Sequence, residues 1–321
     1  MPLVDVVIVN YNGGHYLRRA LDALQAQTFR DFRVIVVDNA STDDSLADIP
    51  IGPIRTRIVH APGNLGFAGG NNLAFRQGLE AKWVALLNPD AFPREDWLER
   101  LMDAAATDTG HQFFGCRMLN AEDGTTLDGA GDVYHVSGMH WRDGHGCKDG
   151  PAYDKPVEIF GPCGAAALYR SDDIRRMGGF DEDFFCYAED VDLAFRMRLD
   201  GLRCRYVPDA VVEHVGSGIV GVRSDFARYH AHRNLVWTYV KNMPGMLFWV
   251  YLPYHLLLNV ASLAVFTLQG RWIMWRAKRD ALLGLRHCLR KRRAVQSGRR
   301  VAASEIRRVL RGGLPRRTCR T

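Results

Sequence analysis

The stretch Trp83-Val84-Ala85-Leu86-Leu87-Asn88-Pro89-Asp90-Ala91 decides the fold that the sequence predicts. Its first five residues form a short apolar run, which is typical of a strand buried on both faces. The polar residues that follow leave one carboxylate, Asp90, at the carboxyl end of the strand, where open α/β sheets bind ligands. A carboxylate there suits a hard divalent cation beside substrate phosphates. Asn, Pro and Asp also favour turns, so the segment taken alone is compatible with an ordinary turn.

Apolar runs and helical patterns alternate along the first 90 residues. The expected strands are Val4–Val9, Val34–Val37, Arg57–His60 and Trp83–Leu87. Helical patterns between them cover Leu17–Leu24 and Leu73–Leu79. Strand alternating with helix predicts βαβ units, and therefore an α/β fold with a doubly wound, mostly parallel sheet.

A polar turn follows each expected strand, at Asn10–Gly14, Asp38–Asp43, Gly63–Asn72 and Asn88–Asp90. Because the carboxyl ends of parallel strands lie at one edge of a sheet, these turns converge on one crevice. Glycines at 63–72 permit a close approach of backbone to ligand, and the helix N-terminus beyond them favours phosphate. The spacing is neither G-x-G-x-x-G nor G-x-x-x-x-G-K-[ST], so neither a dinucleotide-dependent dehydrogenase nor a P-loop NTPase is supported.

Gly178–Leu193 carries a second informative pattern, in which an acidic segment leads into a helix. Glu189, Asp190 and Asp192 crowd the first turn of that helix, where acidic residues stabilise the N-terminus. Asp192 also lies four residues before Arg196, which is the spacing of a local ion pair. Crowded carboxylates raise one another's pKa as well, and this suits a general base.

Two apolar segments follow the helix, a strand at Arg205–Pro208 and a segment Val211–His214 that ends in a histidine. His214 is a candidate second metal ligand or phosphate contact, and a structural histidine is the alternative.

Residues 103–160 are polar and glycine-rich. We expect strands of a mixed sheet there, with a mobile loop around residues 138–150 on the acceptor side. Their histidines match no metal motif and are expected at the surface; they are His135, His140 and His145.

Cysteine content and the first residues indicate a reducing compartment. The seven cysteines are odd in number and lack C-x-x-C spacing, which argues against a zinc site or a disulfide framework. Met1–Asp5 leads directly into a strand without a basic segment, so no signal peptide is expected.

The C-terminal part differs from the rest in charge and hydrophobicity. Residues 271–321 contain 17 Lys or Arg against two acidic residues, a net charge of +15, while the remaining 270 residues carry −9. Such a tail is expected to bind an anionic surface, either a membrane or a nucleic acid. The alternative is a solvated, disordered run of charges. Met246–Leu268 has no charged residue and is long enough to span a bilayer.

A single span would put the basic tail across the membrane, against the positive-inside tendency. We therefore expect a re-entrant or in-plane arrangement broken at Pro253, peripheral or monotopic on the cytoplasmic face. A buried helical hairpin packed on the catalytic part is the alternative.

Five motifs occur in order along the chain, at Val7–Asn12, Val36–Ser41, Asn64–Asn71, Leu87–Asp90 and Gly179–Leu193. In this order and spacing the chain resembles inverting glycosyltransferases of family 2, which have the GT-A fold, and most closely their rhamnosyltransferase-like branch. The resemblance covers residues 4 to 216. We accordingly expect a catalytic domain over 1–240 and a helical, membrane-associating region over 241–321.

The resemblance implies roles for the matching positions. Asp38 would hydrogen-bond the nucleotide base, and Asp90 would hold Mg²⁺ or Mn²⁺ against the diphosphate, with His214 as the candidate second ligand. Asp190, with Glu189 beside it, would be the catalytic base. The remaining positions expected to line the nucleotide-sugar pocket are Asn10, Tyr11, Asn12, Asn64, Gly66, Gly69, Asn71 and Asn88.

The implied reaction is a single displacement with inversion. Rhamnose or a similar hexose would move from a dTDP- or UDP-sugar to a hydroxyl of a glycan or lipid-linked glycan in cell-surface polysaccharide synthesis.

The sequence departs from the family pattern at two places. Asn88-Pro89-Asp90 replaces the D-x-D of most relatives, so metal affinity is expected to be low. No Q-x-x-R-W follows the acidic motif, so one sugar per encounter is expected.

Two alternatives come from other classes. A nucleotidyltransferase would share an α/β nucleotide fold, but no G-x-G-T-R-L-like opening follows the first strand. A nucleic-acid-binding protein would use the basic tail, but the tail lacks aromatic residues beyond position 276 and any known nucleic-acid module. We therefore expect no nucleic-acid partner.

Overall fold

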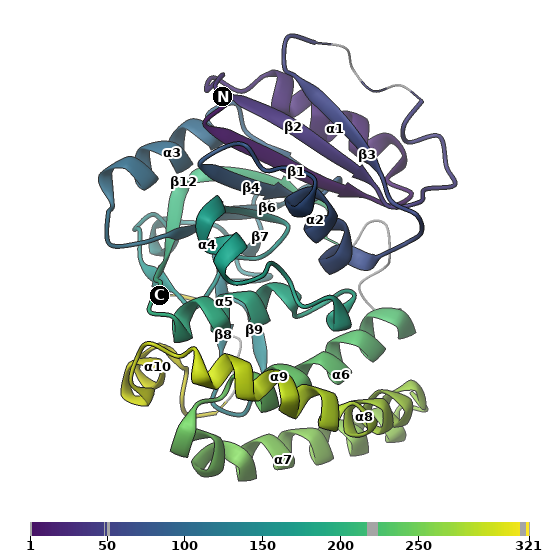
Figure 1. Cartoon of the computed structure of the whole chain (residues 1–321), viewed down its shortest axis with the longest axis vertical. Helices are drawn as coiled ribbons and strands as arrows, with labels where there is room; N and C mark the ends of the chain where they lie inside the picture. Colours follow the sequence, from purple (N-terminus) through teal and green to yellow (C-terminus); the bar gives the residue numbers. More distant parts are fainter. Residues whose placement is uncertain (1, 48, 50–51, 217–223, 315–318, 321) are drawn as a thin grey trace.

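The four strands predicted in the first 90 residues lie side by side in one parallel array (Figure 1). A computed structural model of the chain describes residues 2–47, 49, 52–216, 224–314 and 319–320. The array runs in the order β4 (Trp83–Leu87), β1 (Val4–Asn10), β2 (Phe32–Asp38) and β3 (Thr56–His60). Asn10 is opposite Asp38, and Asp38 is opposite His60, so the carboxyl ends of these strands are level.

The sheet continues beyond β4 as a mixed sheet, because β11 runs antiparallel to both of its neighbours. Its remaining strands are β11 (Ala166–Arg170), β6 (Phe113–Asn120), β12 (Cys204–His214), β10 (Glu158–Ile159), β5 (Ala91–Pro93) and β7 (Leu127–Gly129). The two apolar segments predicted before His214 form one strand, β12, which is interrupted by an irregularity between Val207 and Val211. The predicted α/β fold class is confirmed.

Helices cover both faces of the sheet. One face carries α1 (Gly14–Gln25) and α3 (Trp97–Thr107); the other carries α2 (Gly66–Arg76), α4 (Ser171–Arg176) and α5 (Glu189–Leu199). Val6 and Ile8 of β1 pack with the core beneath α1 and α3, whereas Val7 packs with the opposite core. This alternation follows from the two-residue period of a strand, and burial on both faces explains the continuous apolar runs.

The region between α3 and β11 is more ordered than its composition predicts. β8 (Asp132–Tyr134) and β9 (His140–Arg142) form a separate hairpin, and the short 3-10 helix η1 (Pro151–Tyr153) follows. His145 is exposed as predicted, but the surface prediction for His135 is wrong. His135 is buried, with Nε2 2.9 Å from the carbonyl oxygen of Gly313, because the C-terminal segment covers it.

The prediction that the cysteines form no disulfide is also wrong. Cys147 and Cys319 are joined by a disulfide, with their Cα atoms 5.7 Å apart. A bond between residues 172 positions apart leaves no mark in local spacing. The described cysteines other than this pair are free thiols.

Five helices form a layer beneath α5 at the C-terminal end of the chain (Figure 1). They are α6 (Asp225–Asn242), α7 (Gly245–Leu268), α8 (Ile273–Leu283), α9 (Leu285–Ser297) and α10 (Ala303–Val309). The basic tail is therefore helical over most of its length rather than a disordered charge run. The predicted break at Pro253 is absent, because α7 continues through it.

α7 is long and apolar enough to cross a membrane, and it is the helix among the described residues that meets this test. Only 6% of its apolar stretch is buried, so it is not the core of a buried hairpin. The expected domain boundary after residue 240 falls near the end of α6, and the separation into two domains stays a prediction.

The buried carboxylate of Asp5 connects β1 with β2 and with the loop before β4. It pairs with Arg33 at 2.5 Å and accepts the N–H groups of Glu80 and Ala81 at 2.8 and 3.0 Å. We expect Asp5→Asn to lower the free energy of unfolding by roughly 3 kcal/mol, because Arg33 loses its buried partner and keeps only the half-exposed carboxylate of Glu80. Urea unfolding followed by circular dichroism measures the change.

Glu80→Gln is the control, since Glu80 binds the same guanidinium at 2.8 Å from a side chain that is 45% exposed. Its unfolding midpoint should change little. Equal losses in the two variants would contradict the importance assigned to the buried pair.

Candidate active site

The polar turns after β1 and β2 meet around Ser41. Asn10 donates from Nδ2 to the Ser41 and Ser45 hydroxyls at 3.0 and 2.8 Å. Asp38 accepts the backbone N–H of Ser41 at 3.1 Å, and its other oxygen lies 3.2 Å from Nδ1 of His60. Two of the predicted nucleotide-binding residues are thus brought together at the carboxyl edge of the sheet.

Tyr11 and Asn12 form the rim of the same turn. Asn12 has a positive φ of 53°, and its side-chain oxygen accepts the N–H of Thr42 at 2.8 Å. This fixes the turn without using regular secondary structure. Tyr11 is 39% exposed, so its ring is accessible at the edge of the crevice.

Asn39, which the sequence did not single out as a site residue, connects the β2 turn with the glycine-rich segment. Its Nδ2 donates to Oδ1 of Asn64 at 3.0 Å, and its Oδ1 accepts the N–H of Leu65 at 2.9 Å. Oδ1 of Asn64 also accepts the N–H of Gly66 at 2.9 Å. Gly66 has a φ of +69°, and a Cβ there would lie 2.3 Å from the carbonyl oxygen of Phe185.

The segment predicted as a glycine-rich loop is therefore mostly helix. Gly69 and Asn71 lie within α2, where a Cβ on Gly69 would lie 2.7 Å from Leu65 Cβ and Asn71 donates to the Phe67 carbonyl at 2.9 Å. The contact of Gly69 with Leu65 and that of Asn71 with Phe67 both lie within α2 and the residue before it. A role for these two residues in donor binding stays a prediction.

Asp90 and His214 face each other at the end of β4, as the candidate metal ligands should. Asp90 is buried, with Oδ1 3.3 Å from Nε2 of His214, but the two atoms do not have hydrogen-bond geometry. The backbone before Asp90 is fixed, since Asn88 donates its N–H to the carbonyl of Ala165 at 2.8 Å. The side chains from two distant segments thus converge here.

Asp128 of β7 completes this cluster, and nothing in its polar sequence surroundings marks it. Its Oδ2 lies 2.8 Å from Nδ1 of His214, and it also binds Arg142. Burial by itself raises the pKa of Asp128, but Arg142, His145 and His214 outweigh it and hold the pKa well below its usual range. Burial by itself lowers the pKa of His214, yet Asp128 and Asp90 raise it to about 9.

A divalent cation fits this geometry. Asp90 supplies a carboxylate and His214 supplies Nε2, while Asp128 on Nδ1 fixes the ring, as carboxylates do behind metal-bound histidines. No group of three or more His, Cys, Asp or Glu side chains with metal-binding geometry occurs among the described residues. The low metal affinity expected from Asn88-Pro89-Asp90 stays a prediction.

Asp190 is held at the first turn of α5 by backbone donors. Its Oδ2 accepts the N–H of Gly164 and its Oδ1 the N–H of Val191, both at 2.8 Å. Tyr187 and Ala188, which precede the helix, have positive φ values of 69° and 66°, so the chain turns sharply into this position. The carboxylate is fixed in orientation before any substrate binds.

Two carboxyl groups near Asp190 have pKa values above their ordinary range. Burial and the charge of Asp190 raise the pKa of Glu189 well above its ordinary value. The same two causes, in the same order, raise the pKa of Asp132. The effect that crowding predicts is therefore seen at Glu189.

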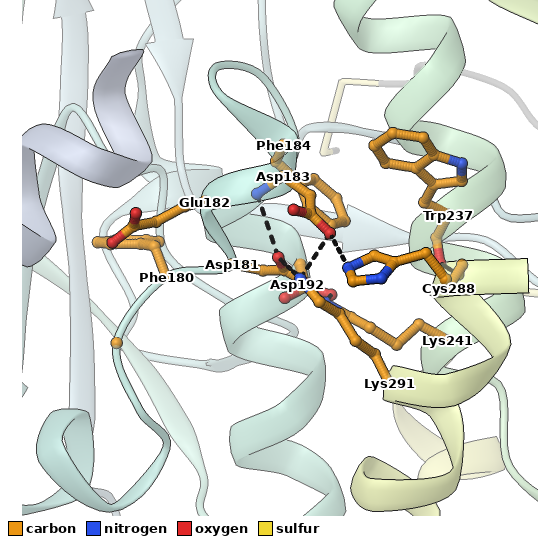
Figure 2. Close-up of polar contacts among 12 residues, drawn as sticks. Phe180, Asp181, Glu182, Asp183, Phe184, Asp192, Trp237, Lys241, Cys288 and Lys291 are labelled. Atoms are coloured by element: carbon orange, nitrogen blue, oxygen red, sulfur yellow. Dashed lines mark hydrogen bonds and ion pairs between the residues drawn. The ribbon is translucent and has the colours of Figure 1, made fainter. Parts of the chain in front are cut away.

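A buried ammonium group connects this acidic segment to the C-terminal helices (Figure 2). Lys241 of α6 lies 2.5 Å from Oδ2 of Asp181 and 2.7 Å from Oδ1 of Asp192, and its side chain is 3% exposed. Lys291 of α9 binds Asp181 as well, and it lies 2.6 Å from Asp183. Burial by itself raises the pKa of Asp181, but the two lysines hold it well below its usual range.

Asp192 therefore has partners beyond the one its spacing predicts. The ion pair with Arg196 is present at 2.9 Å, and Asn242 donates to Asp192 at 2.7 Å. Because Lys241 and Asn242 lie on α6, the C-terminal helices pack onto the segment that carries Asp190.

Parallel strands followed by polar turns, a carboxylate fixed at the start of α5 and an Asp–His pair after β4 are the arrangement expected of a glycosyltransferase of the GT-A type. The chain belongs to Glycosyl transferase family 2, whose sequence profile matches residues 5–178. The resemblance seen in the sequence is confirmed.

Relatives of known name lie in the same family. The chain is 33% identical over 213 residues to the Pre-mycofactocin glycosyltransferase of Mycobacterium tuberculosis, which covers 66% of this chain and 42% of that protein. It is 28% identical over 235 residues to the N-acetylglucosaminyl-diphospho-decaprenol L-rhamnosyltransferase of the same organism, covering 66% and 76%. The chain thus spans less than half the length of the first relative.

Solved structures confirm the fold. The mannosyltransferase PcManGT of Pyrobaculum calidifontis, in complex with GDP-Man and Mn²⁺, is similar with a TM-score of 0.52. The two chains are 20% identical, and the match covers 92% of this chain and 85% of the other. At this identity the likeness shows the fold alone.

We expect Asp128→Asn to lower the pKa of His214 by at least about one unit from about 9, because the imidazolium loses an adjacent negative charge. An NMR titration of the histidine ring in metal-free protein measures it. Asp149→Asn, which removes a carboxylate bound to Arg117 instead, should leave His214 unchanged. An unaltered titration in Asp128→Asn would refute the assigned contact.

We expect Lys241→Met to lower the free energy of unfolding by roughly 3–5 kcal/mol, since it leaves Asp181 and Asp192 buried without their shared cation. Lys291→Met is the control, because the Lys291 side chain is 33% exposed and its loss should cost much less. Thermal and urea unfolding of the two variants give the comparison. A smaller loss in Lys241→Met than in Lys291→Met would show that the bridge is unimportant.

Proposed function

We propose that the protein is an inverting, non-processive glycosyltransferase that moves rhamnose or a similar hexose from a dTDP- or UDP-sugar to a hydroxyl of a lipid-linked glycan. The observation that carries this is the fixing of the Asp190 carboxylate by two backbone donors at the start of α5. The mycobacterial L-rhamnosyltransferase among the relatives supports the sugar and the class of acceptor.

The donor would lie across the turns at the carboxyl edge of the parallel strands. Asp38 is placed to accept hydrogen bonds from the base, and Tyr11 and Asn12 form the rim beside it. Asn10, Asn64 and Gly66 support the same pocket from below through the contacts described above. With the base beside Asp38, the diphosphate would lie beside Asp90.

Asp90 and His214 are the residues that would hold Mg²⁺ or Mn²⁺. Such a cation, when bound, stabilises the negative charge of a nucleoside-diphosphate leaving group. Asp128 would keep the His214 ring in the orientation that presents Nε2 to the site. The Mn²⁺ in the PcManGT complex supports this choice of cofactor.

Asp190 would act as the general base. Its carboxylate takes the proton of the acceptor hydroxyl, while that oxygen attacks the anomeric carbon from the face opposite the leaving group. The bond to the diphosphate breaks as the new glycosidic bond forms, which inverts the configuration.

The enzyme would work at the cytoplasmic face of the cell membrane as a peripheral or monotopic protein. The exposed apolar side of α7 supports attachment, with Trp249 and Tyr254 64% and 55% exposed. Membership of Glycosyl transferase family 2 argues against the alternative of a nucleotidyltransferase. We propose no nucleic-acid partner.

Calorimetric titration of detergent-purified protein with UDP, dTDP and GDP, with and without Mn²⁺ or Mg²⁺, tests the donor site. We expect micromolar binding of one nucleotide that requires the metal, as for typical enzyme substrates. Clean titrations without binding of any of the three would reject the transferase function.

Substitutions of Asp190 and Asp90 should have different effects on turnover and on nucleotide binding. Asp190→Asn should reduce turnover by on the order of a thousandfold while leaving nucleotide affinity nearly normal, because the amide cannot take a proton. Asp90→Ala should instead weaken metal-dependent nucleotide binding. Asp172→Asn, on the exposed surface of α4, is the control and should be as active as the wild type. Normal turnover in Asp190→Asn would remove the base assignment.

A further inference from the structure

A cleft of about 480 Å³ lies between the start of α7 and the outer side of α9, within the basic C-terminal layer. It is lined by Gly245, Leu289, Arg292, Arg293, Gln296 and Arg299. Three of the six lining residues are arginines, and no acidic residue is among them. A cluster of like charges without a counter-ion is unfavourable unless water or an anion fills the space.

Many other cations of the C-terminal region are already paired. Lys291 binds Asp181, Arg300 binds Asp200 and Arg279 binds Asp280. None of the three cleft arginines forms an ion pair within the described part of the chain. The cleft is thus a region where positive charge is left without neutralisation.

The three arginines differ in how they are held. Arg292 donates to the carbonyls of Val240 and Met243 at 2.8 and 2.7 Å, which fixes its guanidinium at the end of α6. Arg299 places Nη1 in a buried position without a hydrogen-bond partner among the described residues. Arg293 is exposed at the cleft mouth. A buried guanidinium N–H without an acceptor calls for a ligand that supplies oxygen atoms.

The surroundings of the cleft are apolar and open to solvent. Met246, Trp249 and Val250 on the first turns of α7 are 70%, 64% and 54% exposed, and Leu289 on the cleft wall is 47% exposed. A tryptophan beside arginines on an apolar surface is typical of the interface between lipid headgroups and acyl chains. A small soluble anion would have no use for this apolar surface.

α7 is held so that this side stays outward. His255, midway along the helix, is buried with Nδ1 2.8 Å from the carbonyl oxygen of Ser137, and its ring stacks on Tyr239 at 4.0 Å. One side of α7 is therefore attached to the protein and the other is exposed. A helix with this division lies along a membrane surface instead of crossing it, which brings the cleft to the level of the headgroups.

We propose that the cleft binds the phosphate group of an anionic membrane lipid, with Arg292, Arg293 and Arg299 around the phosphate and the acyl chains along the exposed side of α7. Arginine suits phosphate because its planar donors pair with two oxygens at once. The N-terminus of α7 at Gly245 adds its partial positive charge. The proposal rests on the membrane location proposed above, but not on sugar transfer.

Co-sedimentation of the full chain with phosphatidylcholine vesicles, with and without phosphatidylglycerol, tests the site. Arg293→Gln/Arg299→Gln should lose roughly tenfold in affinity for the anionic vesicles and retain the wild-type affinity for the neutral ones. The charge-matched control Arg286→Gln/Arg290→Gln changes two exposed arginines of α9 outside the cleft, and it should lose much less. Equal losses in both pairs would overturn the site in favour of diffuse charge attraction.

Inorganic phosphate separates a lipid site from a free-anion site. Millimolar phosphate at constant ionic strength should not release the protein from anionic vesicles. Release of the protein by phosphate would overturn the lipid assignment. Melting temperature and nucleotide binding without vesicles are measured on each variant. If the double variant does not fold, Arg293→Gln alone replaces it, with an expected loss of roughly fivefold. Failure of nucleotide binding with intact vesicle discrimination would reject the transferase function only.

Discussion

The shape of the catalytic segment depends on one buried cation, the ammonium group of Lys241. Asp181 and Asp192 stand at the two ends of that segment, and neither carboxylate is stable in the interior without a positive partner. Lys241 draws them together, so the residues between them must form a tight loop, with left-handed backbone at Phe185, Tyr187 and Ala188. Asn234 of α6 stabilises this loop by donating to the carbonyls of Phe184, Cys186 and Tyr187. The position of Asp190 follows from these contacts, so the C-terminal helices are part of what builds the site.

Local periodicity was sufficient to predict the parallel half of the fold. A strand buried on both faces must be apolar throughout, and β1, β2 and β4 show this in the sequence. The acidic first turn of α5 was predictable for the same reason, because helix start signals are local. Convergence of the polar turns then follows from the parallel arrangement alone. This convergence singled out Asp90, whereas the roles of Asn10 and Asp38 came from the resemblance; all three stay predictions.

The contacts that were missed join segments far apart in the chain. Asp128 lies on a three-residue strand in a glycine-rich region, and only its distance to His214 reveals its role. Lys241 is a single lysine at the end of a helix, and Lys291 is one cation among many in the tail. The burial of His135 and the Cys147–Cys319 disulfide both depend on where the last residues of the chain return to the fold. Net charge suggested a solvated tail, but a count of charges does not show which of them have buried partners.

The arrangement of α6, α7 and α9 connects the proposed lipid site with the proposed catalytic base. Gln296 of α9 lines the arginine cleft and donates to the carbonyls of Lys241 and Asn242 at the end of α6. Asn242 donates in turn to Asp192 on α5, the helix that begins beside Asp190. The cleft and the catalytic helix are thus connected through two adjacent residues of α6, whose own positions depend on the buried charge of Lys241. If the acceptor is lipid-linked, as we propose, the proposed base Asp190 needs a fixed height above the bilayer. The C-terminal layer is held to α5 by ion pairs and hydrogen bonds on one side and is exposed along α7 on the other, so it would set that height.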